Sequence, residues 1–398
     1  MQELRLPECF PVLHQIESTM KEVVIVQRVV CEYRKAFYSC LRKELSAKDI
    51  NLRLITGTPR RGEEAFDVLD DLSFGERRAT TYFYKTVCWI HGLHSATKSA
   101  DMVILVQENA ALYTYPFLLM RLMGKEIPRL GFWGHGANMG RVDSRILLDK
   151  WREFWLRRVD WWFAYTAKTK GILTTAGFSS DRITVVNNST DTTLLREIVN
   201  KQRARSDQLF AEIFCCSRSR ESRVGFYCGR LIESKMILFL LDSIKQIHAR
   251  LPGFFMIIVG DGPLSEDVKL FCADNNWCKW TGAKWSSERA DYLSVADIWL
   301  NPGALGLAVT DAFAAGLPLA TTDNKIHGPE ISYLEDQKTG LMTKNVVGEY
   351  VDSVARILTE DGLLVKAKAE AQREGYKYSA EMMANRFAAG IDECMKTN

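Results

Sequence analysis

Residues 224–241 read VGFYCGRLIESKMILFLL, and this stretch decides the fold that we expect for the chain. The short apolar run Val224–Cys228 is typical of a buried strand in a parallel sheet. Gly229 then permits a tight turn, and a leucine-rich helical pattern begins at about Met236. A strand, a turn and a helix in this order predict one unit of an open α/β sheet.

Two cations, Arg230 and Lys235, lie between that strand and that helix. Ligands of open α/β sheets bind beyond the carboxyl ends of the strands, where helix N-termini also favour anions. A planar guanidinium and a compact ammonium together suit a diphosphate. The plainer interpretation is a turn with two solvated cations, and the motifs further along the chain weigh against it.

Length, composition and charge limit the classes of protein to which the chain can belong. The 398 residues suffice for two α/β domains, and 47% apolar and 25% charged residues are ordinary globular values. Residues 1–187 hold 27 Lys/Arg against 21 Asp/Glu, a net charge of +6, and the remainder holds 25 against 28, or −3. This asymmetry suggests that the first half meets an anionic partner, such as a membrane surface or an acidic acceptor. The charge difference between the two halves is too small to indicate binding of nucleic acid.

No motif indicates a metal site or a membrane span. The ten cysteines include no C-x-x-C pair and no Cys/His group at zinc spacing, so reduced thiols of a cytosolic protein are expected. Residues 1–17 lack the apolar core of a signal peptide. No run approaches the roughly 18 apolar residues of a membrane span. We therefore expect a cytoplasmic protein, either soluble or attached to the inner face of the cytoplasmic membrane.

Strand and helix patterns alternate through the first half, which predicts a parallel sheet. The expected strands are Val23–Val30, Leu52–Ile55, Met102–Gln107, Arg129–Trp133, Trp161–Tyr165 and Ile183–Val186. Helical patterns cover about Thr80–Thr97 and Tyr113–Met123, and the polar residues 56–75 predict a loop on the crevice side. The polar segment Asn187–Asp191 is the expected domain boundary.

Candidate active-site residues follow several of these strands. His135 stands between Gly134 and Gly136 after a strand, where it would be exposed at the crevice rather than packed in the core. A purely structural histidine is the competing interpretation. Arg34 and Glu108 lie at comparable strand ends and are weaker candidates, because charged residues in such loops are usually just solvated.

Residues 145–163 (RILLDKWREFWLRRVDWWF) combine aromatic residues with Arg and Lys at helical spacing. One interpretation is an amphipathic helix at an anionic membrane surface, with Trp151 and Trp155 at the interface. The other is a helix packed on its own sheet with a basic outer face. The second is favoured, because Trp161–Tyr165 is expected to begin the next strand.

The second half continues the alternation. Phe254–Val259 predicts a buried strand, and the Gly260-Asp261-Gly262-Pro263 turn after it differs from the dinucleotide-binding G-x-G-x-x-G signature. A dehydrogenase is therefore a weak hypothesis. A short strand at Lys279–Thr281 precedes Gly282. Another strand then leads into NPGALGLAVTDAFAAGLPLATTD (301–323), a glycine loop before a small-residue helix, with an aspartate about two turns into that helix.

Together these motifs resemble the GT-B glycosyltransferases, in particular the retaining family commonly numbered four. The resemblance covers Val224–Met342: a strand with G-R-L-x-x-x-K, a strand with G-D-G-P, and a glycine loop leading into D-A-x-A-x-G-x-P. It implies an α/β fold of two Rossmann-like, doubly wound parallel-sheet domains facing across a cleft. We expect an acceptor-side domain over 1–187, a donor-binding domain over 188–378, and a helix over 379–398 that crosses back to the first domain.

The resemblance also implies roles for individual residues. As catalytic residues, Arg230 and Lys235 would grip the donor's diphosphate, and His135 would lie beside the transferred sugar. Asp311 would hold the ribose hydroxyls, whereas Gly303 stands where the family has its first acid and cannot supply that hydrogen bond. The positions expected to bind substrate are Arg34, Gly229, Gly260, Gly282, Gly303, Ala304, Leu305, Gly306, Leu307, Asp311 and Glu330.

The activity implied is transfer of a sugar from a UDP- or GDP-sugar to a hydroxyl of a glycan or lipid-linked acceptor. It would retain the anomeric configuration and need no metal or other cofactor. Surface polysaccharide or lipopolysaccharide biosynthesis is the setting that the family suggests. A GT-B-fold nucleotide-sugar epimerase is an alternative, as is a non-catalytic nucleotide-sugar-binding homologue, because of Gly303. Nucleic acid is not an expected partner.

Overall fold

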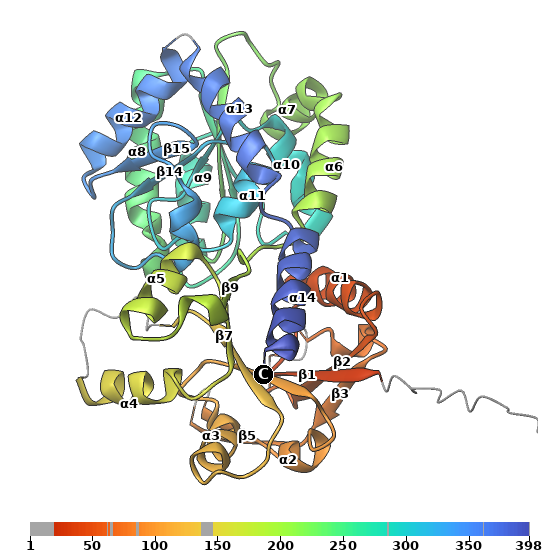
Figure 1. The fold of residues 1–398 in the computed structure, drawn as a ribbon. Coiled ribbons are helices and arrows are strands. Elements are labelled where there is room, and N and C mark those ends of the chain that lie inside the picture. Colours follow the sequence, from red (N-terminus) through yellow and green to blue (C-terminus); the bar gives the residue numbers. More distant parts are fainter. Residues whose placement is uncertain are drawn as a thin grey trace, which may run out of the picture.

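The computed structural model describes residues 20–61, 63, 67–84, 87–136, 146–284, 286–360 and 362–397. Two parallel β-sheets lie in different halves of the chain, and helices cover both faces of each sheet (Figure 1). The prediction of two doubly wound α/β domains is therefore confirmed. The expectation of no signal peptide falls on residues 1–17, which lie outside the described residues.

The N-terminal sheet has seven strands in the order β3-β2-β1-β6-β7-β8-β9. Their bounds are β1 Lys21–Gln27, β2 Ile50–Gly57, β3 Gly75–Arg78, β6 Met102–Val106, β7 Arg129–Gly134, β8 Trp161–Ala164 and β9 Ile183–Val185. Val23 and Ile25 pack into one apolar layer, and Val24 and Val26 pack into the other. Because both faces of β1 are buried, the strand reads as an uninterrupted apolar run.

Helices flank this sheet on both sides. One layer holds α1 (Lys35–Ser46), and the other holds α2 (Leu93–Ala96), α3 (Tyr115–Leu122) and α4 (Ile146–Leu156). α5 (Ala167–Thr175) follows β8 and lies next to the C-terminal domain (Figure 1).

The C-terminal sheet has six strands in the order β12-β11-β10-β13-β14-β15. Their bounds are β10 Arg223–Cys228, β11 Phe254–Val259, β12 Cys278–Trp280, β13 Ile298–Leu300, β14 Leu319–Thr322 and β15 Gly340–Thr343. One apolar layer includes α6 Thr192–Arg203, α7 Ser206–Phe214, α10 Ala290–Val295, α11 Ala308–Ala314 and α13 Leu363–Gly375. The other includes α8 Ile237–Arg250, α9 Ser265–Asp274 and α12 Val347–Thr359. The opening stretch thus forms β10, its turn and α8, as predicted.

The strand order changes direction at one point in each sheet. In the first sheet the point lies between β1 and β6, and in the second it lies between β10 and β13. Open α/β sheets bind ligands in the crevice beyond the carboxyl ends of these two strands. The turn after β10 and the loop after β13 therefore meet where a ligand is expected.

The last helix, α14 (Ala380–Lys396), packs against the N-terminal sheet although it follows the C-terminal one (Figure 1). Phe387 stacks on Phe163 of β8, with ring centroids 4.0 Å apart and planes 5° apart. A Cβ on Gly390 would lie 2.2 Å from the Thr184 hydroxyl oxygen, so glycine permits the close approach of α14 to β9. Apolar packing thus connects the end of the chain to the first domain.

Two local predictions were wrong. Where a helix over Thr80–Thr97 was expected, the described residues form the antiparallel strands β4 (Thr80–Tyr84) and β5 (Val87–Ile90), followed by the short helix α2. The β-branched and aromatic residues of this stretch favour strands. Asp311 lies in the first turn of α11, not two turns in, because the glycine loop extends to Leu307.

Candidate functional site

The turn after β10 and the loop after β13 are in direct contact. The Ala304 N–H donates to the Ser234 carbonyl oxygen at 2.8 Å, and Lys235 Nζ donates to the Ala304 carbonyl oxygen. A Cβ built on Gly303 would lie 2.2 Å from the carbonyl carbon of Lys235. The backbone of Lys235 therefore fills the space that a side chain at position 303 would need. This packing accounts for glycine where the family resemblance leads one to expect an acid.

The two predicted diphosphate ligands lie in different surroundings. Lys235 is partly buried, and burial lowers the pKa of its ammonium group, while the Cys228 thiol acts in the opposite direction. Arg230 is exposed, and its guanidinium has no hydrogen bond or ion pair within the described residues. Lys235 is thus a desolvated cation that an anion would stabilise, and Arg230 is free to reach a ligand.

The four backbone N–H groups of residues 304–307 differ in whether they donate to a protein acceptor. The Ala304 N–H is used by Ser234, and the Leu305 N–H donates to Nδ1 of His327 at 3.1 Å. The N–H groups of Gly306 and Leu307 have no acceptor among the described residues. Of the four predicted amides, these two at the start of α11 are available to a ligand.

Asp311, the predicted ribose-binding residue, is 6% exposed and is held by two protein groups. One carboxylate oxygen accepts a hydrogen bond from the Thr190 hydroxyl at 2.7 Å, and the other pairs with Arg289 at 2.7 Å. Each carboxylate oxygen keeps a second lone pair with which it can accept a hydrogen bond from a ligand hydroxyl group. The carboxylate is therefore fixed in position without being saturated.

Arg34 and Glu330 are linked through Asn188 at the domain junction. Nη2 of Arg34 donates to the Asn188 side-chain oxygen at 2.5 Å, and Asn188 Nδ2 donates to Glu330 Oε1 at 2.5 Å. Burial raises the pKa of Glu330, although Asn188 and Arg34 lower it. The Arg34 guanidinium also lies 5.0 Å from the ring centroid of Trp133. The structure therefore places both side chains in contacts between domains, and their binding of substrate stays a prediction.

His135 follows β7 in the same junction. Its ring meets the Tyr165 ring edge-on, with centroids 4.3 Å apart, and its buried Nδ1 has no hydrogen-bond partner among the described residues. Burial, with a smaller effect of Arg34, lowers the pKa of His135 to about 4. The expectation that His135 is exposed at the crevice is therefore wrong, because the ring is partly buried against Tyr165. The imidazole is neutral at pH 7, and its Nδ1 has no protein partner among the described residues.

Three of the five predicted substrate-binding glycines, Gly229, Gly260 and Gly282, follow the carboxyl ends of the adjacent strands β10, β11 and β12. Gly260 has φ +145°, and a Cβ there would lie 1.9 Å from the Gly229 carbonyl oxygen. Its N–H donates to the Gly282 carbonyl oxygen at 2.9 Å. Gly282 has φ +70° with open space around its Cβ position. Glycine at position 260 therefore lets the turns after β10 and β11 pack closely at this edge of the sheet.

Four residues of this region were missed by sequence reasoning: Asn188, Thr190, Arg289 and His327. Nδ1 of His327 accepts from a backbone N–H, so its proton is on Nε2, which donates to the Thr322 carbonyl oxygen at 2.7 Å. Asn188 and Thr190 lie in the polar segment interpreted only as a boundary. His327 precedes the Gly-Pro-Glu sequence noticed for its glutamate, and Arg289 has no recognisable motif.

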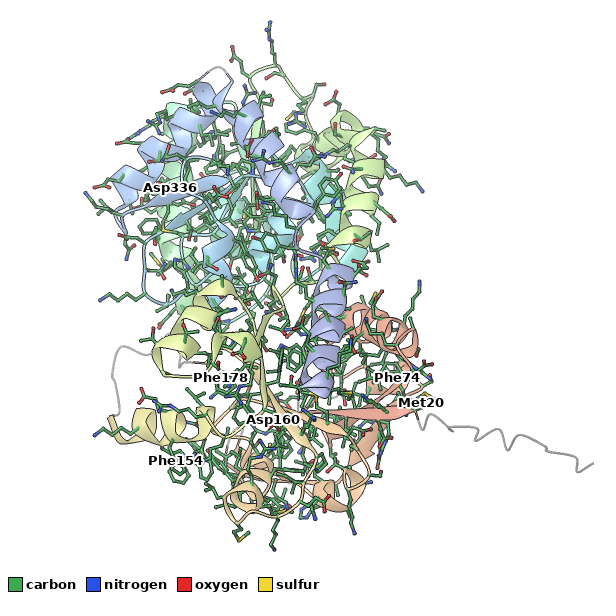
Figure 2. All side chains as sticks on the ribbon, viewed as in Figure 1. Met20, Phe74, Phe154, Asp160, Phe178 and Asp336 are labelled. Atoms are coloured by element: carbon green, nitrogen blue, oxygen red, sulfur yellow. The ribbon has the colours of Figure 1, made fainter. Side chains whose placement is uncertain are left out.

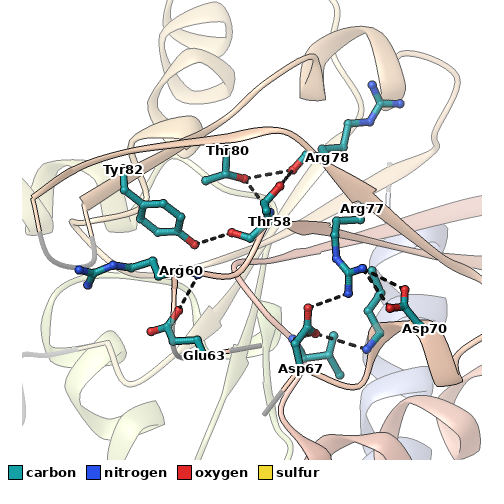
Figure 3. A network of polar contacts seen from close by, with 11 residues as sticks. Thr58, Arg60, Glu63, Asp67, Asp70, Arg77, Arg78, Thr80 and Tyr82 are labelled. Atoms are coloured by element: carbon teal, nitrogen blue, oxygen red, sulfur yellow. Dashed lines mark hydrogen bonds and ion pairs between the residues drawn. The ribbon is translucent and has the colours of Figure 1, made fainter. Parts of the chain in front are cut away.

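The polar segment after β2 is fixed by its own network (Figure 3). Arg77 pairs with Asp67 at 2.8 Å and with Asp70 at 3.0 Å. The Tyr82 hydroxyl donates to the Thr58 carbonyl oxygen at 2.8 Å. The predicted loop lies beyond the carboxyl end of β2, so this network stabilises that edge of the first sheet.

Helix α4 agrees in part with both interpretations of residues 145–163, the helix at a membrane surface and the helix packed on its own sheet. Trp155 is 5% exposed and packs in the core, whereas Trp151 and Phe154 are 47% and 43% exposed. Figure 2 shows Phe154 beside α4, at the lower left of the view. Trp155 also lines a hollow beyond the end of β6, together with Glu108 and Thr114. Both the Trp155 indole nitrogen and the Thr114 hydroxyl are buried without a partner among the described residues. α4 is therefore packed on its own sheet and yet exposes two aromatic rings.

Across the described ranges, every helix is too short or too polar to cross a bilayer. Within the same part of the chain, no three His, Cys, Asp or Glu side chains form a group that could hold a metal ion.

The whole fold is similar to those of solved glycosyltransferases. A glycosyltransferase from Rickettsia africae superposes with a TM-score of 0.71 at 14% identity, over 95% of this chain and 99% of that one. HepE from Anabaena, solved in complex with UDP, superposes with a TM-score of 0.67 at 14% identity, over 93% of this chain and 98% of that one. The two-domain architecture is that of the GT-B glycosyltransferases.

The C-terminal half carries the family resemblance at the level of sequence. Residues 222–360 match the family model described as Glycosyl transferases group 1, which confirms the resemblance inferred from the motifs. A stretch of 145 residues is 30% identical to the GDP-mannose-dependent alpha-(1-6)-phosphatidylinositol monomannoside mannosyltransferase of Mycobacterium tuberculosis. That match spans 33% of this chain and 36% of the relative.

Proposed function

We propose that this protein is a retaining glycosyltransferase that moves a sugar from a nucleoside-diphosphate sugar to a hydroxyl group of an acceptor. The observation that carries the proposal is the desolvated ammonium group of Lys235 at the switch point of the C-terminal sheet. Arg230 on the same turn, the open amides of Gly306 and Leu307, and Asp311 of α11 would complete a site for a nucleoside diphosphate beyond the carboxyl ends of β10 and β13.

The chemical difficulty of this reaction is the negative charge that develops on the departing diphosphate. Fixed donors placed where that charge appears are the largest single aid to such a reaction, each being worth about 100- to 1000-fold in rate. Lys235, Arg230 and the amides of Gly306 and Leu307 would supply four such donors. We propose that they act without a metal ion, so that activity persists in EDTA.

Retention of configuration would follow if the acceptor hydroxyl lost its proton to the departing phosphate on the same face of the sugar. This route needs no protein base. The neutral imidazole of His135 would instead form a hydrogen bond to a sugar hydroxyl through its unpartnered nitrogen. Product analysis by NMR distinguishes retention from inversion, and an inverted anomeric centre would refute this part of the proposal.

One observation supports a lipid-linked acceptor. The mycobacterial relative is described as acting on a phosphatidylinositol mannoside. A UDP- or GDP-sugar is the proposed donor, and assembly of a surface polysaccharide or lipopolysaccharide is the proposed setting.

We also propose that the surface formed by α3 and α4 contacts an anionic membrane from the cytoplasmic side. Its exposed apolar residues are Leu119, Leu122, Met123, Trp151 and Phe154. Tyr115 of α3 contacts Trp151 of α4, with ring centroids 5.9 Å apart, so the two helices are adjacent. Lys125, Lys150 and Arg158 flank these residues, and aromatic and basic side chains together suit a bilayer interface.

Sedimentation with anionic liposomes tests the membrane contact. Trp151→Ser/Phe154→Ser should lose binding, whereas Leu238→Ser/Leu270→Ser should keep it, because those two leucines are each 60% exposed on the other domain. Equal binding by both double variants would refute the proposed surface.

The catalytic proposal is tested by Lys235→Ala and Arg230→Ala. Each should lower kcat at least about tenfold while the thermal unfolding midpoint stays within a few degrees of wild type. Lys245→Ala, an exposed lysine on α8, is the matched control and should turn over normally. Wild-type turnover in both variants would refute the diphosphate assignment.

The absence of an acid at Gly303 favours a second candidate, a non-catalytic protein that binds nucleotide sugar. It would bind UDP or GDP with no turnover of any donor, with or without acceptor. An epimerase would instead release nucleotide from the donor without an acceptor. Measuring nucleotide release in the presence and absence of acceptor glycans separates all three activities.

A further inference from the structure

Two cysteines lie in contact at the edge of the C-terminal sheet. Cys272 is near the end of α9 and Cys278 begins β12, with five residues between them. Their sulfur atoms are 3.4 Å apart, and both are free thiols. We propose that Cys272 and Cys278 form a site of reversible oxidation, in which a small-molecule disulfide converts the two thiols into an intramolecular disulfide bond.

Formation of the disulfide bond needs only a small movement of the two sulfur atoms. A disulfide bond has a sulfur–sulfur distance of about 2.05 Å, so the two sulfurs must approach by a little over 1 Å. Cys272 lies on the last turn of its helix, where rotation of one side chain supplies this movement. The spacing of the two cysteines matches no redox motif, so only the packing of α9 against β12 brings them together.

The two thiols differ in access and in acidity. Cys272 is partly exposed, whereas Cys278 is 1% exposed, so a dissolved disulfide can reach only Cys272. The hydrogen bond with Cys278, and more weakly Lys279 and the Trp280 backbone, lower the pKa of Cys272 against the effect of burial. Burial raises the pKa of Cys278 well above its ordinary value. Because the thiolate is the nucleophile, Cys272 attacks first and Cys278 resolves.

The oxidation proceeds by two successive thiol–disulfide exchange steps. The Cys272 thiol releases its proton to solvent, and its sulfur attacks one sulfur of the small disulfide; that bond breaks and one thiolate leaves, taking up a proton. The Cys278 sulfur, after losing its proton, then attacks the Cys272 sulfur of the mixed disulfide and expels the second thiolate. The two protein thiols are oxidised and the small disulfide is reduced to two thiols.

The new bond would stabilise an edge that contacts the donor-side turns. Trp280 of β12 donates from its indole nitrogen to the Gly260 carbonyl oxygen at 2.9 Å. Between the two cysteines, Trp277 stacks on His248 with planes 10° apart. Closing this seven-residue loop should raise the unfolding midpoint of the C-terminal domain by roughly 5 °C.

The experiment uses the full chain carrying Cys215→Ser and Cys216→Ser, because those adjacent cysteines are exposed and would react independently. The protein is incubated with oxidised glutathione, quenched with acid and measured by intact mass spectrometry. We expect the loss of two hydrogen atoms, and peptide mapping without reductant should link the two cysteines. Dithiothreitol should reverse both changes.

Single variants in the same background identify the order of attack. Cys278→Ser should accumulate one glutathione adduct on Cys272, because no second thiol can expel it. Cys272→Ser should acquire neither an adduct at Cys278 nor a cross-link. A parent protein that keeps both thiols under these conditions would overturn the proposal, as would an adduct that forms on Cys278 rather than Cys272.

Discussion

Replacing Gly303 by alanine tests the packing on which the donor site depends. The added carbon would lie 2.2 Å from the carbonyl carbon of Lys235 and 2.5 Å from its Cα and its carbonyl oxygen. Carbon atoms in proteins pack at about 3.5–4.0 Å, so the Lys235 backbone must retreat by more than about 1 Å. The atoms in the way are main chain, so no side-chain rotation relieves the clash.

Overpacking of this kind destabilises a domain by about 1–3 kcal/mol. The same displacement moves the Lys235 ammonium away from the Ala304 carbonyl oxygen and from the proposed phosphate position. We therefore expect Gly303→Ala to lower the free energy of unfolding of the C-terminal domain by that amount. Affinity for UDP or GDP should fall about tenfold, which corresponds to about 1.4 kcal/mol.

Urea unfolding and isothermal titration calorimetry measure the two effects. Gly306→Ala is the matched control for stability, because a Cβ there has no atom within 4 Å and the residue lies in the same loop. Its free energy of unfolding should stay within about 0.5 kcal/mol of wild type. If Gly303→Ala is as stable as Gly306→Ala, the close approach of the two loops is wrong. Gly303→Glu is expected to disrupt the site rather than to restore an acid.

Three further predictions concern the domain junction and the donor side. Asn188→Ala should destabilise the protein by about 1–3 kcal/mol, because it leaves buried polar partners, Glu330 among them, unpaired; urea unfolding that matches wild type would contradict the network. The His135 ring should titrate near pH 4 by NMR, and a midpoint near 6.5 would contradict its burial. Because the unfolded state binds more protons than the folded state between these pKa values, the free energy of unfolding should decrease as the pH is lowered from about 6.5 to about 4, by roughly 1 kcal/mol per pH unit, and His135→Gln should lose that contribution. Arg289→Leu leaves the buried Asp311 carboxylate without its cation and should cost about 3 kcal/mol, and adding Asp311→Asn should recover part of that loss.

Much of the donor side could be predicted because its signals are local. A buried strand, a glycine turn and a helix need only neighbouring residues to be recognised, and the ligand position follows from the geometry of parallel sheets. Lys235 was predicted in this way, and the structure places it at the switch point beside the loop after β13. The hairpin at residues 80–90 was missed because apolar spacing there matched a helix while residue type favoured strands.

The hydrogen-bond partners of the predicted residues could not be inferred from local sequence patterns. Asn188 meets Glu330 across 142 positions, and Thr190 meets Asp311 across 121. No local pattern links such distant residues, and a polar segment between two domains looks like any linker. The structure makes Asn188 and Thr190 the contacts between the linker and two acids that the resemblance assigns to the donor.

The amino-acid sequence by itself determined two parallel sheets, most of the strands that build them, and a pair of cations after the first strand of the second sheet. These features depend on the periodicity of apolar residues and on turn residues, which act over a few positions. Only the tertiary structure decided that position 303 has no room for a side chain, that Asp311 is paired with Arg289, and that Cys272 touches Cys278. Such contacts are set by how separate elements pack, because close packing is a property of atoms in space and not of spacing along the chain.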